Sequence, residues 1–146
     1  MIVLVVLISL FALTSALYND TGAENQNWAV NLFGNSLYQW QDSDRSRFAE
    51  KPTIDLLKDK DVVAIYFSAS WCAPCRQFTP ILEQFYNDMN KKLRGRFEIV
   101  LLSRDSSAEE FVSYYQKMPW LAVPFTDGRL EKCLDIAAKA YQLKGM

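Results

Sequence analysis

The chain has 146 residues, half of them apolar and 14% aromatic, a composition typical of one globular domain and not of a disordered segment. Its 16 Lys and Arg side chains nearly balance its 17 Asp and Glu side chains, so nucleic-acid binding by phosphate neutralisation is not expected. The sequence contains no histidine, which excludes Ser-His-Asp and Cys-His catalysis and zinc sites with histidine ligands.

The N-terminus has the pattern of a targeting segment. Residues 1–13 are almost wholly apolar, and the small residues 14–16 follow them. We therefore expect residues 1–16 to be a signal peptide that directs the protein to the secretory pathway, where it is secreted or stays in the lumen of the endoplasmic reticulum. A membrane anchor is the alternative, although the run is shorter than the roughly 20 residues of a spanning helix. A buried N-terminal strand or helix is the third possibility. No stable membrane association is expected after cleavage.

Residues 17–50 are polar with scattered aromatic side chains, and we interpret them as an N-terminal extension. Within this extension, residues 29–34 are predicted to form a short edge strand or a turn, and residues 41–46 an exposed loop. A globular domain is predicted over residues 51–146, and residues 52–60 are expected to form a helical turn before its first central strand.

The pattern of the remaining chain alternates between strands and helices. Residues 62–68 (VVAIYFS) form a β-branched and aromatic run, which predicts a strand buried on both faces. Apolar residues at steps of three and four then predict a helix that continues to Leu93 and ends at residues 94–96. A strand, a helix, an apolar segment with two prolines and a third helix follow, at 97–102, 108–117, 118–125 and 130–141. This order favours βαβ units with a parallel sheet.

Two cysteines stand where the strand at 62–68 passes into the helix. A sulfur at a helix N-terminus is stabilised as a thiolate by free backbone N–H groups and by the helix dipole. Cys75 lies three residues after Cys72, within reach of it in the next turn. We therefore interpret Cys72 as an exposed attacking nucleophile and Cys75 as the shielded thiol that resolves the mixed disulfide.

Half of a zinc site and a pair of buried structural cysteines are the alternatives for this pair. An all-cysteine site needs two further thiolates, and only Cys133 remains in the chain. Cys133 is interpreted as a lone, half-buried thiol in the third predicted helix. No metal and no other cofactor is expected.

Two segments carry a family resemblance: VAIYFSASWCAPCRQFTPILEQFY (63–86) and FEIVLLSRDSSAEEFVSYYQKMPWLAVPF (97–125). Both resemble the thioredoxin superfamily, and within it the tryparedoxin/nucleoredoxin branch. The resemblance implies a thioredoxin-like, three-layer α/β fold with a mostly parallel central sheet. It further implies a truncation before the C-terminal hairpin and last helix, because Gly145-Met146 matches the start of a Gly-x-Pro-like tripeptide. The strand at 62–68 or its neighbour would then have a bare edge.

The resemblance also implies roles for the residues around the cysteines. Trp71 would flank the active site, with Cys72 as nucleophile and Cys75 as resolving thiol. Ala73 stands where this branch usually has proline, so that Ala73 and Pro74 separate the two cysteines.

Three further positions bear on the site. Arg76 either favours the Cys72 thiolate or faces solvent. Tyr66 occupies the strand position of a buried aspartate that assists proton transfer in thioredoxins. Trp120, between two prolines, either lines a groove for a partner or packs under the sheet.

The predicted function is that of a thiol–disulfide oxidoreductase, specifically a protein-disulfide reductase. Its partners would be protein or small-molecule disulfides as substrates and a thiol as electron donor. The alternative is a non-enzymatic, redox-dependent interaction module of the nucleoredoxin type.

Overall fold

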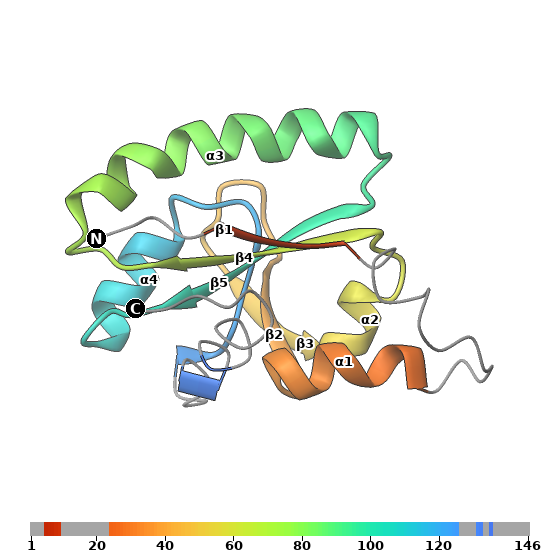
Figure 1. Cartoon of the computed structure of the whole chain (residues 1–146). Coiled ribbons are helices and arrows are strands. Elements are labelled where there is room, and N and C mark those ends of the chain that lie inside the picture. The colour runs from red at the N-terminus through yellow and green to blue at the C-terminus, as the bar shows by residue number, and fades with distance from the viewer. Residues whose placement is uncertain (1–4, 10–23, 126–130, 133–134, 136–146) are drawn as a thin grey trace.

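A computed structural model of the chain describes residues 5–9, 24–125, 131–132 and 135. Within them, six strands form one sheet in the order β1-β4-β5-β6-β2-β3. Helix α3 lies on one side of this sheet and helices α1 and α2 lie on the other (Figure 1). The elements in chain order are β1 (Val5–Ser9), α1 (Glu24–Phe33), β2 (Ser36–Trp40), β3 (Phe48–Pro52), α2 (Thr53–Leu57), β4 (Val62–Ser68), α3 (Ala73–Lys92), β5 (Phe97–Ser103), α4 (Ala108–Tyr115) and β6 (Leu121–Ala122).

Strands β4, β5 and β6 form the parallel centre of the sheet. Alternate β4 side chains enter two separate cores, because successive residues of a strand point to opposite faces. Val63 and Ile65 pack with α1 and α2, whereas Ala64 and Tyr66 pack with residues of α3 and α4. The layered α/β fold predicted from the sequence is thus confirmed, with a mixed sheet whose outer strands pair antiparallel.

The segment predicted as an N-terminal extension contributes to this same sheet. Strand β2 pairs antiparallel with β6, where Tyr38 lies opposite Ala122, and with β3 on its other side. The predicted edge strand or turn at residues 29–34 is wrong, because these residues end helix α1. Ala29, Leu32 and Phe33 have helical spacing and are buried against the sheet.

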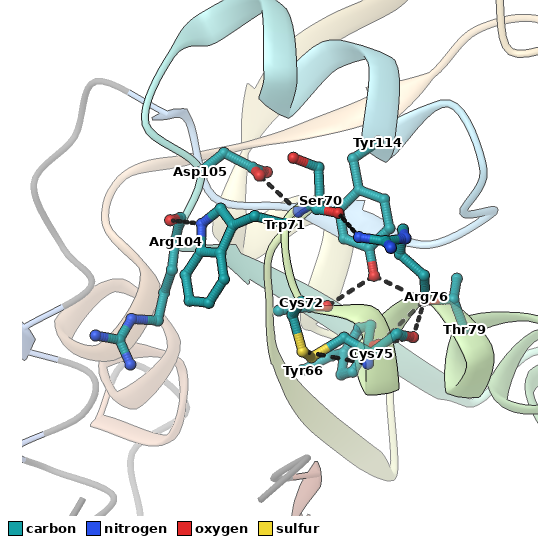
Figure 2. The surroundings of a disulfide bond; sticks show 11 residues. Tyr66, Ser70, Trp71, Cys72, Cys75, Arg76, Thr79, Arg104, Asp105 and Tyr114 are labelled. Carbon is teal, nitrogen blue, oxygen red and sulfur yellow. Dashed lines mark hydrogen bonds between the residues drawn. A yellow bond between two sulfur atoms is a disulfide. The ribbon is translucent and has the colours of Figure 1, made fainter. Parts of the chain in front are cut away.

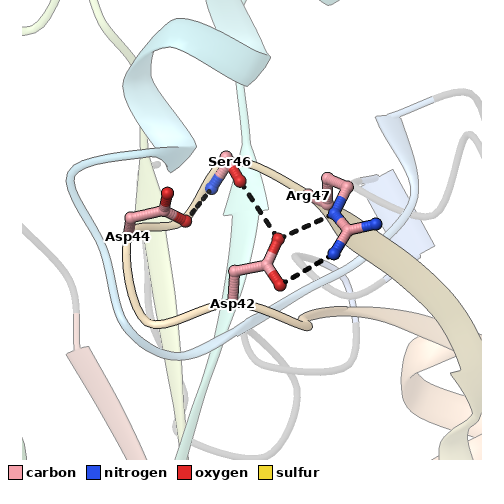
Figure 3. Close-up of polar contacts among 4 residues, drawn as sticks. All are labelled: Asp42, Asp44, Ser46 and Arg47. Carbon is pink, nitrogen blue, oxygen red and sulfur yellow. Dashed lines mark hydrogen bonds and ion pairs between the residues drawn. The ribbon is translucent and has the colours of Figure 1, made fainter.

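The predicted exposed loop joins β2 to β3, and the carboxylates of Asp42 and Asp44 hold it. Asp42 accepts hydrogen bonds from the Arg47 guanidinium at 2.8 and 3.1 Å and from the Ser46 hydroxyl at 3.0 Å (Figure 3). Asp44 accepts a further one from the Ser46 backbone N–H. The Arg47 hydrogen bond, followed by that of Ser46, holds the pKa of Asp42 below its ordinary value.

The apolar segment with two prolines, residues 118–125, packs into the hydrophobic core. Trp120 is 1% exposed, and its ring meets those of Tyr66 and Tyr86 edge-on, with centroids 5.9 and 5.7 Å apart. Of the two interpretations of Trp120, the structure therefore supports packing against the sheet over a groove for a partner.

Strand β1 lies within the predicted signal peptide. It pairs antiparallel with β4, with Val5 opposite Tyr66 and Ser9 opposite Val62. In the full chain, the edge of β4 that was expected to be bare is therefore paired, and cleavage after residue 16 would remove this strand. The predicted cleavage point near Ala16 and almost all of the third predicted helix, including Cys133, lie outside the described residues. Among the helices that the structure describes, none is long and apolar enough to cross a membrane.

Helix α3 ends at Lys92, close to the predicted end at residues 94–96, and a left-handed turn follows it. Arg94 has φ 51° and Gly95 has φ 78°, and the Gly95 N–H donates to the Asn90 carbonyl at 2.9 Å. A side chain in this conformation costs free energy, whereas glycine adopts it freely.

Replacing Gly95 with alanine is expected to lower the free energy of unfolding by about 1 kcal/mol. The cost is conformational, since no atom lies within 4 Å of the added Cβ. The neighbouring Arg94→Gly substitution removes such strain and is expected to leave stability unchanged or raise it. Urea denaturation of both variants measures the difference, and a Gly95→Ala protein as stable as the unsubstituted chain would contradict this account.

Candidate active site

The two cysteines lie at the junction of β4 and α3. Cys72 is the N-cap of α3, with extended backbone angles (φ −80°, ψ 100°), and its N–H donates to the Ala69 carbonyl at 3.1 Å. The Cys75 backbone N–H donates to the Cys72 Sγ at 3.2 Å. Pro74 fits in the first turn because the N–H it lacks would have no partner within the helix there.

Cys72 and Cys75 form a disulfide, with their Cα atoms 5.2 Å apart (Figure 2). The sequence predicted one exposed and one shielded sulfur, but in this disulfide state the residues are only 2% and 3% exposed. The bond holds both sulfurs against the first turn of the helix, and the Cys72 sulfur also faces the Cys75 N–H. The disulfide state therefore does not itself distinguish attacking from resolving sulfur.

Trp71 is the exposed aromatic side chain beside the disulfide. Half of its surface is exposed, and its indole N–H donates to the Arg104 carbonyl at 3.0 Å (Figure 2). Asp105 makes a second link between the same two loops, because it accepts from the Ser70 N–H at 2.6 Å and from the Ser103 hydroxyl at 2.7 Å. The loop before the cysteines is thus fixed to the loop after β5.

Arg76 is exposed, and its guanidinium donates to the Ser70 carbonyl. This contact favours the solvent-facing interpretation, in which Arg76 braces the turn that precedes Cys72. Ala73 and Pro74 are exposed on the first turn of α3.

Buried hydroxyl groups lie beneath the first turn of α3. Tyr66 donates to the Cys75 carbonyl at 3.2 Å, and Thr79 donates to the same carbonyl at 2.9 Å. The sequence analysis missed Thr79, although its place four residues after Cys75 puts it on the same helix face. It also missed Tyr114, whose hydroxyl lies 2.9 Å from that of Thr79.

In the part of the chain that the structure describes, no group of three or more His, Cys, Asp or Glu side chains could hold a metal ion. The pairing of Cys72 with Cys75 also occupies the two thiols that a zinc site would need.

A family model described as thioredoxin-like matches residues 59–144. Probable nucleoredoxin 1 of Arabidopsis thaliana is 48% identical over 86 residues, which are 59% of this chain and 14% of that protein. Tryparedoxin of Trypanosoma brucei brucei is 54% identical over 63 residues, which are 43% of this chain and 42% of the tryparedoxin. The chain thus spans less than half the length of these two relatives.

Solved structures of tryparedoxins share the fold. Tryparedoxin II from C. fasciculata has a TM-score of 0.61 and 35% identity, over 83% of this chain and 72% of the other. A structure of tryparedoxin II complexed with glutathionylspermidine has a TM-score of 0.58 and 38% identity, over 77% and 69% of the two chains. With the family model matching more than half of its residues, the chain belongs to the thioredoxin-like family, in the branch of the tryparedoxins and nucleoredoxins.

Proposed function

We propose that this chain is a protein-disulfide reductase in which Cys72 and Cys75 carry the electrons. Membership of the thioredoxin-like family supports a thiol–disulfide oxidoreductase role in general. The observation that carries the specific proposal is the disulfide between Cys72 and Cys75 at the N-terminus of α3. A dithiol that closes to a disulfide within one helical turn can pass two electrons to a substrate disulfide.

The reaction starts from the dithiol form of the protein. The Cys72 thiolate attacks one sulfur of the substrate disulfide, a mixed disulfide forms, and the other substrate sulfur leaves as a thiolate that takes up a proton. Cys75 then loses its proton and attacks the Cys72 Sγ, which closes the Cys72–Cys75 disulfide and releases the second substrate sulfur as a thiolate that takes up a proton. Two electrons have passed from the protein to the substrate, and the two protons come from Cys75 and from water. A thiol donor must then reduce the Cys72–Cys75 disulfide again.

One backbone donor supports the choice of Cys72 as the attacking group. The Cys75 N–H that faces the Cys72 Sγ at 3.2 Å would donate to the thiolate of the reduced protein. Backbone donors and the helix dipole at such a position lower the free energy of the anion relative to the thiol.

The donor is proposed to be a small thiol compound. This proposal is based on the structure of tryparedoxin II complexed with glutathionylspermidine, because this chain is 38% identical to that protein. The secretory pathway is the compartment proposed from the N-terminal sequence pattern.

Insulin reduction by the recombinant chain with a thiol donor tests the assignment. Cys72→Ser is expected to abolish the activity, because no attacking thiolate remains, and Cys75→Ser to stop turnover at the mixed disulfide. Cys133→Ser is the matched control and should retain full activity.

Equal activity of Cys72→Ser and the unsubstituted chain would refute the assignment. Binding of partner proteins that survives loss of both Cys72 and Cys75, without insulin reduction, would instead favour the interaction-module alternative.

Trp71→Ala is expected to raise the KM for insulin about threefold to tenfold with a smaller change in kcat, because a half-exposed indole offers apolar contact worth about 1 kcal/mol. Ile81→Ala is the control, since Ile81 is also an exposed apolar side chain but lies further along α3. Steady-state kinetics of both variants measure the effect. An equal change of the KM in the two variants would contradict a role of Trp71 in substrate contact.

A further inference from the structure

Four buried hydroxyl groups converge on the first turn of α3. They belong to Tyr66 and Ser68 of β4, Thr79 of α3 and Tyr114 of α4, and each of these residues is at most 3% exposed. The Ser68 hydroxyl lies 2.8 Å from that of Tyr114, which lies 2.9 Å from that of Thr79. Thr79 in turn donates to the Cys75 carbonyl at 2.9 Å. Figure 2 shows Tyr114 and Thr79 side by side next to the disulfide.

The hydrogens available to these hydroxyls limit how they can pair, because each hydroxyl has one hydrogen to donate. The Thr79 hydroxyl contacts the Cys75 carbonyl, the Tyr114 hydroxyl and, at 3.1 Å, the Tyr66 hydroxyl, and in the two hydroxyl contacts either oxygen could donate. In the arrangement in which Thr79 donates to the Cys75 carbonyl, Tyr114 donates to Thr79 and Ser68 donates to Tyr114. The chain of hydroxyls then runs from Ser68 through Tyr114 and Thr79 to the Cys75 carbonyl.

Tyr114 is the link that joins three elements. It belongs to α4, and its hydroxyl is hydrogen-bonded to Ser68 of β4 and to Thr79 of α3. Burial raises its pKa to about 12, so the hydroxyl keeps its hydrogen at neutral pH. Without this hydroxyl, Ser68 would lose its contact with Tyr114, and Thr79 would keep only the Tyr66 hydroxyl, at 3.1 Å, as a hydroxyl partner. Buried polar groups that lose a partner are costly.

The first turn of α3 has a particular need for such an anchor. Pro80 lies inside the helix and has no N–H to donate to the carbonyl of Arg76, four residues earlier. The turn that carries both cysteines is therefore joined less strongly to the rest of its own helix. The hydroxyl chain ties it to the sheet and to α4 instead.

We propose that Tyr114 is a positioning residue for the Cys72–Cys75 couple, holding the first turn of α3 so that the two sulfurs stay within bonding distance in the dithiol. This inference deepens the proposed function and rests on the same redox couple. Pre-organisation of two reacting groups raises their effective concentration and so favours bond formation. For this couple, it stabilises the disulfide relative to the dithiol.

Equilibration of the full chain with glutathione tests the proposal. In this exchange the protein dithiol and one oxidised glutathione give the protein disulfide and two reduced glutathione molecules, so atoms and electrons balance. Tyr114→Phe keeps the ring and removes the hydroxyl. It is expected to lower the equilibrium constant for disulfide formation about threefold to tenfold, which raises the reduction potential by about 15 to 30 mV.

Tyr115→Phe is the matched control. Tyr115 is the next residue of α4, is fully buried, and donates to the Trp120 carbonyl at 2.8 Å, not to the hydroxyl chain. Loss of the Tyr115 hydroxyl should reduce the free energy of unfolding about as much as loss of the Tyr114 hydroxyl does. It should leave the reduction potential of the Cys72–Cys75 couple unchanged. Thr79→Val, which removes the next link, should shift the potential in the same direction as Tyr114→Phe, and the two shifts should not add in the double variant.

An unchanged potential in Tyr114→Phe, or an equal shift in Tyr115→Phe, would overturn the inference. If Tyr114→Phe does not fold, Thr79→Val and Ser68→Ala decide the matter, and unchanged potentials in both would likewise overturn it. The equilibrium needs no protein substrate. A chain that fails to reduce insulin but shows the predicted shifts would therefore contradict the proposed function alone.

Discussion

The contact between the Cys75 backbone N–H and the Cys72 Sγ, at 3.2 Å, is the interaction on which the site depends. It exists only because Cys72 caps α3 with extended backbone angles while Cys75 is already helical. An unpaired backbone donor of the first turn is thereby directed at a sulfur. Most other features of the site hold this first turn in place.

The turn is held from three directions. Asp105 fixes the loop before it through the Ser70 N–H, and Arg76 braces the same loop from the helix. Below it, Tyr66 and Thr79 hold the Cys75 carbonyl. Because β4 is buried on both faces, its alternation directs Tyr66 toward α3, so the strand both supports the core and supplies part of the site.

The elements next to the cysteines could be predicted from the sequence because their signals are local. The β-branched run of β4 and the spacing of apolar residues in α3 each determine one element, and the motif between them places the disulfide. Helix α1 was missed because Ala29, Leu32 and Phe33 form too short an apolar set to separate helix from strand. The pairing of Tyr38 with Ala122, and the contact of Tyr114 with Thr79, join segments far apart in the chain, and no local pattern encodes either of them.

The central claim is that the fold stabilises Cys72 as a thiolate, and the pH dependence of its alkylation tests this most directly. In a Cys75→Ser, Cys133→Ser variant, Cys72 is the only thiol that iodoacetamide can modify. We predict that the alkylation rate reaches half its maximum at a lower pH in the folded chain than in the same chain unfolded in urea. The same midpoint in both states, or a higher one in the folded chain, would contradict the account.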